Sequence, residues 1–334
     1  MVLLTLRRRL HELLRPALDA LFARNLPFSI RWRLLALQPI WCLTYSIARL
    51  PHLFREPWVR EEWIPVGPPG HHVRTLVFHT PGTGRGRRLR PLHVQIHGGG
   101  FIGGCPEDNA FFCDRLARET GAVVVSITYR FAPVNPFPAA IDDVDGAVRY
   151  LQEHAEERYG ADATLMTIGG DSAGGNLALA AAQQPGCHAP AATSLKGSVT
   201  FYGAMDLRLM PQEKPVPANY PTKDPMSFLL PLYDTYAGPA RSGNLENPRM
   251  SPIVAQVETL PESMFVGVVG IDILVHEQEE FVKRVSKAFD SESEKHAGRR
   301  VEMVLDPKGF HGYLSRKYYS NSAMRQEAIP LTMR

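Results

Sequence analysis

The segment TLMTIGGDSAGGNLALAAAQ, residues 164–183, is the strongest indication of how this chain folds. Its first eight residues are rich in threonine and apolar side chains and predict a strand that ends at Asp171. The small apolar residues from Ala173 onward predict a helix. The two are joined by a GxSxG pattern centred on Ser172, which is typical of a chain that turns sharply from a strand into a helix with a serine at the turn.

The glycines on either side of this serine have a physical reason. A side chain at Gly170 or Gly174 would crowd so sharp a turn, and the serine itself must adopt a backbone conformation that costs free energy. The free N–H groups at the start of the next helix point toward the turn. An incidental serine in a glycine-rich turn is the competing interpretation, but the flanking strand and helix favour Ser172 as a nucleophile.

A second glycine-rich segment, HGGG at residues 97–100, ends another predicted strand. Backbone N–H groups must come within about 3 Å of a developing oxyanion, and glycine leaves room for that approach. We therefore predict that the N–H groups of Gly99, Gly100 and Ala173 form an oxyanion hole. A phosphate-binding loop is the alternative, but the segment lacks the lysine of a P-loop. We expect His97 to hold the loop rather than to act as a base.

The order of residues along the chain narrows the choice of base. In serine sites built on such a turn, the acid and then the histidine follow the serine. Of the twelve histidines, only His296 and His311 lie late enough. His296 stands among charged residues and is expected to be exposed. His311 comes soon after a predicted strand at 300–306, so we predict His311 as the base.

The acid partner is sought in the same way. Asp272 directly follows a predicted strand and is the preferred candidate. Asp206 and Glu277 are alternatives: Asp206 would come from the preceding strand, and Glu277 lies more than one helical turn farther along. Asp306 stands too near the histidine in sequence. The acid would fix the tautomer of the histidine and stabilise its charged form without taking the proton itself.

Outward from these motifs, strands and helices alternate. Strands are predicted at 75–80, 92–100 (running into the glycine loop), 122–130, 164–171, 194–203, 263–272 and 300–306, and helices at 113–119, 139–159, 173–183 and 277–289. This alternation predicts an α/β fold with a mostly parallel sheet covered on both faces. Residues 1–70, helical and aromatic, and residues 205–247, rich in Pro, Asn, Asp and Tyr, depart from it. Ligands bind beyond the carboxyl ends of such strands, so additions there are expected to form a lid.

Composition excludes several classes of protein. The 334 residues are 44% hydrophobic and 21% charged, with a formal net charge of +3, as is ordinary for a globular enzyme. The arginine runs lack the aromatic interleaving of a nucleic-acid surface, so no nucleic-acid partner is expected. The four cysteines fit no zinc pattern and no CxxC pair. We expect free thiols in a reducing compartment, and neither a metal nor an organic cofactor.

The first twenty residues, MVLLTLRRRLHELLRPALDA, are apolar with interspersed charge. Arg7–Arg9 interrupt the apolar core that a secretory signal needs. The longest later run without charge, residues 34–48, is too short to span a bilayer. We therefore expect a cytoplasmic location. Leucines at helical spacing predict an amphipathic helix. Packing on the protein itself is preferred, with peripheral membrane contact or a cover over the candidate site as alternatives.

Taken together, the motifs resemble those of the hormone-sensitive-lipase-like branch of the α/β-hydrolases. The main ones are HGGG at 97–100, GDSAGGN at 170–176, Asp272 before Ile-Leu, and GFHGY at 309–313. Weaker signatures agree, namely YRFAP at 129–133, FPAA at 137–140, DDV at 142–144 and SP at 251–252. The resemblance covers roughly residues 75–320. One departure is Val134, where the family commonly has a glutamate that supports the site.

The resemblance implies an α/β-hydrolase fold with an eight-stranded, mostly parallel core and a helical cap built from about 1–70 and 205–247. It implies a serine carboxylesterase that hydrolyses a small to medium acyl ester without a cofactor. Deacetylases, lactonases and arylformamidases share this machinery. A non-catalytic ligand-binding receptor on the same fold is the alternative from another class, and the presence of His311 favours an enzyme. The oligomeric state stays open, with a homodimer as one alternative.

Overall fold

The computed structural model describes residues 2–24, 26–49, 59–79, 89–187, 195–222, 227–291 and 295–312. Tyr313, the last residue of the GFHGY motif, lies outside the described residues. The strands are β1 (Val59–Pro65), β2 (His72–Phe78), β3 (Arg90–Ile96), β4 (Val123–Ile127), β5 (Ala161–Asp171), β6 (Gly197–Phe201), β7 (Ser263–Ile271) and β8 (Arg300–Phe310). The α-helices are α1 (Val2–Phe22), α2 (Phe28–Arg49), α3 (Ala110–Thr120), α4 (Ala139–Tyr159), α5 (Ala173–Ala181), α6 (Leu230–Tyr233) and α7 (Val275–Ser291).

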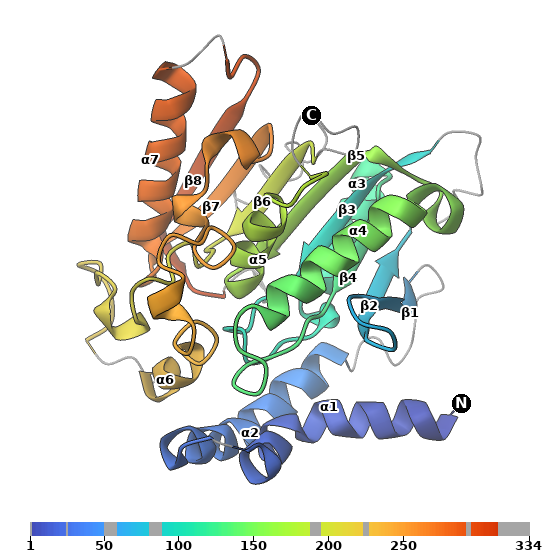
Figure 1. Cartoon of the computed structure of the whole chain (residues 1–334), viewed down its shortest axis with the longest axis vertical. Helices are drawn as coiled ribbons and strands as arrows, with labels where there is room; N and C mark the ends of the chain where they lie inside the picture. The colour runs from blue at the N-terminus through green and yellow to red at the C-terminus, as the bar shows by residue number, and fades with distance from the viewer. Residues whose placement is uncertain are drawn as a thin grey trace.

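The eight strands form one sheet in the order β1-β2-β4-β3-β5-β6-β7-β8 (Figure 1). β1 and β2 are antiparallel, as are β2 and β4, and every other neighbouring pair is parallel. The predicted α/β fold with a mostly parallel eight-stranded sheet is therefore confirmed. Because parallel strands end at the same edge of a sheet, the residues that follow β3, β5, β7 and β8 meet there.

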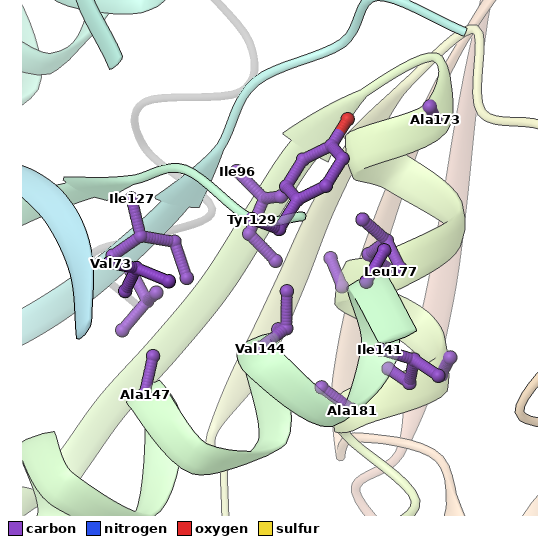
Figure 2. Packing of buried hydrophobic residues seen from close by; sticks show 14 of the residues in the cluster. Val73, Ile96, Ile127, Tyr129, Ile141, Val144, Ala147, Ala173, Leu177 and Ala181 are labelled. Atoms are coloured by element: carbon purple, nitrogen blue, oxygen red, sulfur yellow. The ribbon is translucent and has the colours of Figure 1, made fainter. Parts of the chain in front are cut away.

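Both faces of the sheet are covered by helices. Since successive side chains of a strand point to opposite sides, each strand contributes to two cores. In β4, Val123, Val125 and Ile127 join the core beneath α4 and α5, whereas Val124 joins the core beneath α3. Figure 2 shows how the apolar side chains of α4 and α5 lie against those of the sheet. The labelled examples are Ile141, Val144 and Ala147 of α4, Leu177 and Ala181 of α5, and Val73, Ile96 and Ile127 of the sheet.

Two expectations from the sequence are wrong. Residues 59–65, within the region expected to be helical, form the edge strand β1, in which only Ile64 is buried. An edge strand with one buried side chain carries little of the alternation that marks a strand. His296, expected to be exposed, is buried, because its ring packs 5.3 Å from the ring of Phe289 on α7. It precedes β8 and so lies at the opposite end of that strand from His311.

The first two helices lie together at one end of the molecule (Figure 1). Trp41 of α2 packs on the loop that follows β3: a Cβ added to Gly103 would lie 2.6 Å from the Trp41 ring. The Trp41 indole N–H donates to the carbonyl of Glu12 in α1, 2.9 Å away. No helix in the described ranges is long and apolar enough to cross a bilayer.

Candidate active site

Ser172 stands at the turn between β5 and α5 in a strained backbone conformation. Its φ angle is 53°, in the left-handed region that non-glycine residues avoid. A Cβ added to Gly174 would lie 2.1 Å from the Ile96 carbonyl oxygen, and one added to Gly170 would lie 2.3 Å from the Gly174 carbonyl. The two glycines of the pattern therefore permit the close approach of β5, α5 and the end of β3 that holds the serine at the sheet edge.

His311 lies between Ser172 and Asp272. The Ser172 Oγ and His311 Nε2 atoms are 2.8 Å apart, and His311 Nδ1 is 2.7 Å from Asp272 Oδ2. A carboxylate can only accept, so the Nδ1–H donates to Asp272 and leaves Nε2 free to accept the serine proton. Asp272 is held in turn, because its Oδ1 accepts from the backbone N–H of Leu274 at 3.0 Å.

The electrostatic setting of His311 favours its charged form. Burial of the ring opposes protonation, but the adjacent Asp272 carboxylate more than offsets this, so the pKa of His311 is raised above its ordinary value. The side chain of Asp272 is 2% exposed, whereas that of His311 is 41% exposed. The carboxylate is thus shielded from water while one side of the imidazole stays open.

The other acids considered from the sequence have different partners. Asp206 forms a two-armed ion pair with Arg208. Glu277 is buried, pairs with the Lys214 ammonium, and accepts the backbone N–H of Met205 at 2.7 Å. Asp306 accepts the backbone N–H groups of residues 308 and 309. Among these carboxylates, Asp272 is the one in contact with His311.

The loop after β3 runs beside the serine, since a Cβ added to Gly98 would lie 3.2 Å from the Ser172 Cβ. Gly99 has a φ of 108° and Gly100 a φ of 60°, and a Cβ on Gly99 would lie 2.3 Å from the Gly103 carbonyl oxygen. Only glycine fits this backbone. In the part of the chain that the structure describes, the N–H groups of Gly99, Gly100 and Ala173 donate to no backbone or side-chain acceptor. Unpaired donors near a nucleophile are what an oxyanion hole requires.

Two polar side chains that the sequence did not single out, buried Asp171 and half-buried Asn109, hold this loop against the serine turn. Asp171 Oδ1 accepts from the Gly98 N–H at 3.2 Å and from the Asn109 side-chain amide at 2.6 Å. Burial raises the pKa of Asp171, an effect that these hydrogen bonds oppose. Asp171 could have been singled out in the sequence because it directly precedes Ser172. Asn109 could not, because it is 62 residues away from Asp171 along the chain and stands in no recognisable motif.

His97 lies beneath the same loop and not beside the serine. It is fully buried, contacts the Thr128 hydroxyl through Nε2 at 2.9 Å, and stacks on the ring of Tyr129. Burial lowers the pKa of His97 to about 4, so the ring is neutral near pH 7. The phenolic O–H of Tyr129 lies within 3.3 Å of the carbonyls of His97 and Gly98. These contacts make His97 part of the support of the glycine loop.

Aromatic side chains cover the glycine loop. Tyr233 of α6 packs on Gly100, where an added Cβ would lie 2.4 Å from its ring. Tyr236, three residues on, is fully buried and stacks on Phe101 with ring centroids 4.1 Å apart. Of the tyrosines in this region, Tyr236 is therefore packed inside the protein, and Tyr233 lies over the predicted oxyanion donors.

The chemistry open to this site is that of a nucleophilic serine. Within the described ranges, no three His, Cys, Asp or Glu side chains gather as metal ligands would. What the residues bring together is a hydroxyl, a base oriented by a buried carboxylate, and peptide donors without partners. That combination suits attack on a carbonyl carbon and stabilisation of the resulting oxyanion.

Known proteins share this arrangement of the chain. Residues 93–315 match the family described as having the alpha/beta hydrolase fold. Over 170 residues the chain is 32% identical to the esterase LipI of Mycobacterium tuberculosis, covering 51% of this chain and 52% of that protein. It is 29% identical over 235 residues to the carboxylic ester hydrolase LipN of the same organism, covering 67% and 57%. The matches thus span about half the length of these relatives.

A solved structure extends the comparison. An esterase of Pyrobaculum calidifontis superposes with a TM-score of 0.66 at 27% identity, covering 86% of this chain and 88% of that one. The family match covers well over half of the sequence and includes the serine turn, the glycine loop, Asp272 and His311. The chain belongs to the α/β-hydrolase family, in its hormone-sensitive-lipase-like branch.

Proposed function

We propose that this protein is a serine carboxylesterase that hydrolyses a small to medium acyl ester. The observation that carries the proposal is the pair of contacts Ser172–His311 and His311–Asp272, at 2.8 and 2.7 Å, next to peptide donors without partners. The esterase names of the relatives described above support it. Deacetylases, lactonases and arylformamidases use the same groups, so the proposal concerns the acyl transfer and not one leaving group.

The proposed reaction has two halves. His311 Nε2 takes the Ser172 proton as the serine oxygen attacks the ester carbonyl, and the N–H groups of Gly99, Gly100 and Ala173 bind the oxyanion. His311 then gives that proton to the departing alcohol, which leaves an acyl-serine. Water then loses a proton to His311 as its oxygen attacks the acyl carbonyl, and His311 returns that proton to the Ser172 oxygen as the bond to the acyl group breaks and the acid leaves. Each oxyanion donor of this kind contributes about 3–4 kcal/mol to lowering the barrier.

We also propose that α1, α2 and residues 205–247 form the cap over the site, with β1 belonging to the sheet. Trp41 on Gly103 and Tyr233 on Gly100 bring both segments onto the glycine loop. The two segments are joined to each other, because the Arg33 Nε–H donates to the carbonyl of Phe228 at 2.8 Å. A cap built in this way would exclude water from the oxyanion donors.

Covalent labelling tests the proposal against a ligand-binding role. A fluorophosphonate phosphonylates only a serine activated by a neighbouring base. We expect one equivalent of label on the tryptic peptide that contains Ser172, and none after His311→Ala. Mass spectrometry of the digested protein measures both. A folded protein that takes up no label and hydrolyses no short-chain p-nitrophenyl ester would instead be a receptor on a hydrolase fold.

The pH dependence of kcat/KM is a second expected result. His311 must be neutral to accept the serine proton, and Asp272 raises its pKa above the ordinary value of 6.5. Activity should therefore fall as the pH is lowered, with a midpoint above 6.5. Asp272→Asn removes the charge that raises this pKa, so the midpoint of the residual activity should move to lower pH. A parent midpoint below 6.5 would contradict this assignment.

A further inference from the structure

Helix α2 is apolar on two opposite faces. Its buried side chains recur every three or four residues, and they pack against α1 and the domain: Ile30, Leu34, Leu37, Trp41 and Tyr45. On the opposite side of the helix, a second set of apolar side chains recurs at the same spacing and is exposed to solvent: Phe28, Trp32, Leu35, Leu43 and Ile47. Phe28 is 80% exposed, and Leu43 and Ile47 are each 62% exposed. A helix at a water-facing surface is expected to be polar on its outer side.

Helix α1 continues this outer apolar surface. Leu10, Leu14 and Leu21 have the spacing of one helix face and are 54%, 37% and 62% exposed. Phe22, at the end of α1, is 74% exposed and lies just across the short connection from Phe28. Scattered exposed apolar residues are normal, but two adjoining helices with apolar stripes mark a surface that meets a partner. We call these residues of α1 and α2 the outer apolar face.

The charge around the outer apolar face is of one sign. The first 49 residues contain eight arginines and two acids, Glu12 and Asp19. Beside this face, Arg24 is exposed and the Arg33 guanidinium lies 4.4 Å from the centre of the Trp32 ring. Arg15 and Arg49 instead contact the domain, at the Ile102 carbonyl and the Glu107 carboxylate. Both acids have arginine partners, since Glu12 pairs with Arg49 at 3.1 Å and Asp19 with Arg15 at 3.9 Å. In the described part of these helices no carboxylate is left to balance the exposed Arg24. A second copy of the chain would bring the same positive charge to a symmetric interface, which disfavours self-association.

We propose that the outer apolar face docks on an anionic lipid surface. The exposed phenylalanine, leucine and isoleucine side chains would enter the boundary between headgroups and acyl chains, and Arg24 and Arg33 would pair with anionic headgroups. The helices would lie on the membrane. The inner face of α2 contacts Gly103 through Trp41, so docking would hold the glycine loop about one helix diameter, roughly 10 Å, from the lipid.

Co-sedimentation with vesicles tests this proposal. The full-length protein is mixed with vesicles of phosphatidylcholine alone, or of phosphatidylcholine with phosphatidylglycerol. We expect at least tenfold tighter partitioning onto the anionic vesicles, weakening as salt is added. The variant Leu43→Ser/Ile47→Ser should lower that partitioning at least about tenfold, because each apolar side chain contributes by its burial. Both positions are exposed, so thermal unfolding of this variant should match the parent.

The matched control is Leu165→Ser. Leu165 is 44% exposed and lies early in β5, toward the opposite edge of the sheet from the serine turn. It should leave vesicle binding unchanged. Ser172→Ala should bind vesicles as the parent does, so a failed esterase proposal would not affect this result. Equal binding to both vesicle types, or equal losses in the control and the double variant, would overturn the proposal. So would a dimer that Leu43→Ser/Ile47→Ser converts to a monomer without any vesicle binding.

Discussion

Ser172→Ala is expected to lower kcat for a short-chain p-nitrophenyl ester by about 10⁴- to 10⁶-fold. Among the described residues, the Ser172 hydroxyl is the group that lies within hydrogen-bond distance of His311 Nε2, 2.8 Å away. Removing it leaves substrate binding and the oxyanion donors in place. The residual rate would therefore be that of water attack alone. Steady-state kinetics over a range of enzyme concentrations, with purified variants, measures the effect.

Two comparisons make this result specific. Ser198 of β6 is a buried serine whose hydroxyl has no hydrogen-bond partner among the described residues, so Ser198→Ala removes the same atom without touching the site. It should keep kcat near the parent value. Groups that act as a unit are not additive, so His311→Ala should cost almost nothing further in the Ser172→Ala background. If Ser172→Ala kept the parent rate, or if both changes lowered the rate independently, the serine mechanism would be wrong.

The site could be read from the sequence because each of its parts is a local pattern. The serine turn needs glycines within two residues of Ser172, and the glycine loop needs its own neighbours. Asp272 and His311 were found from strand ends and chain order alone. The parallel sheet brings those ends to one edge, so four segments far apart in the sequence could be assigned to one site before their contacts were known.

What the sequence did not predict depends on contacts between distant segments. His296 stands among charged residues, yet its ring is covered by Phe289. Asn109 belongs to no recognisable sequence motif, yet its side-chain amide donates a hydrogen bond to Asp171. The outer apolar face is another case, because the leucine spacing in the first twenty residues predicts one amphipathic helix and does not say that an apolar side of α1 and α2 stays uncovered. Such features need the positions of the neighbouring elements.

The same limit applies to the ion-pair network that fixes α1 and α2 on the domain. Arg74 of β2 makes two hydrogen bonds to Glu107, at 2.8 and 2.7 Å, and both side chains are 3% exposed. Arg49 of α2 lies 3.4 Å from the same carboxylate, and Glu12 of α1 lies 3.5 Å from Arg74. Glu107 belongs to a short 3-10 helix, Pro106–Asn109, that also carries the amide holding Asp171.

Glu107→Gln is therefore expected to lower the free energy of unfolding by about 3–5 kcal/mol, because it removes the carboxylate that accepts both hydrogen bonds of the buried Arg74. Burial alone would raise the pKa of Glu107, but the adjacent Arg74 outweighs this and holds the pKa near 2. The ionised Glu107 thus stabilises the folded state fully at pH values above 4.5, the ordinary pKa of a glutamate. This contribution is lost as the pH falls from 4.5 toward 2. The parent should lose stability across that range, and the variant should lose less. Urea unfolding at several pH values measures both.

The control is Glu258→Gln, which breaks an ion pair with Lys295 of similar length, 2.6 Å, but with both side chains about half exposed. Exposed ion pairs contribute at most about 1 kcal/mol to the free energy of unfolding, so this change should leave stability almost unaltered. Limited proteolysis adds a local readout, because α1 and α2 should be cut earlier in Glu107→Gln. Esterase activity should fall as well, since the same 3-10 helix positions Asp171 beneath the glycine loop. Equal stability of the two variants would mean that apolar packing such as Trp41 on Gly103, and not the buried charges, holds the helices in place.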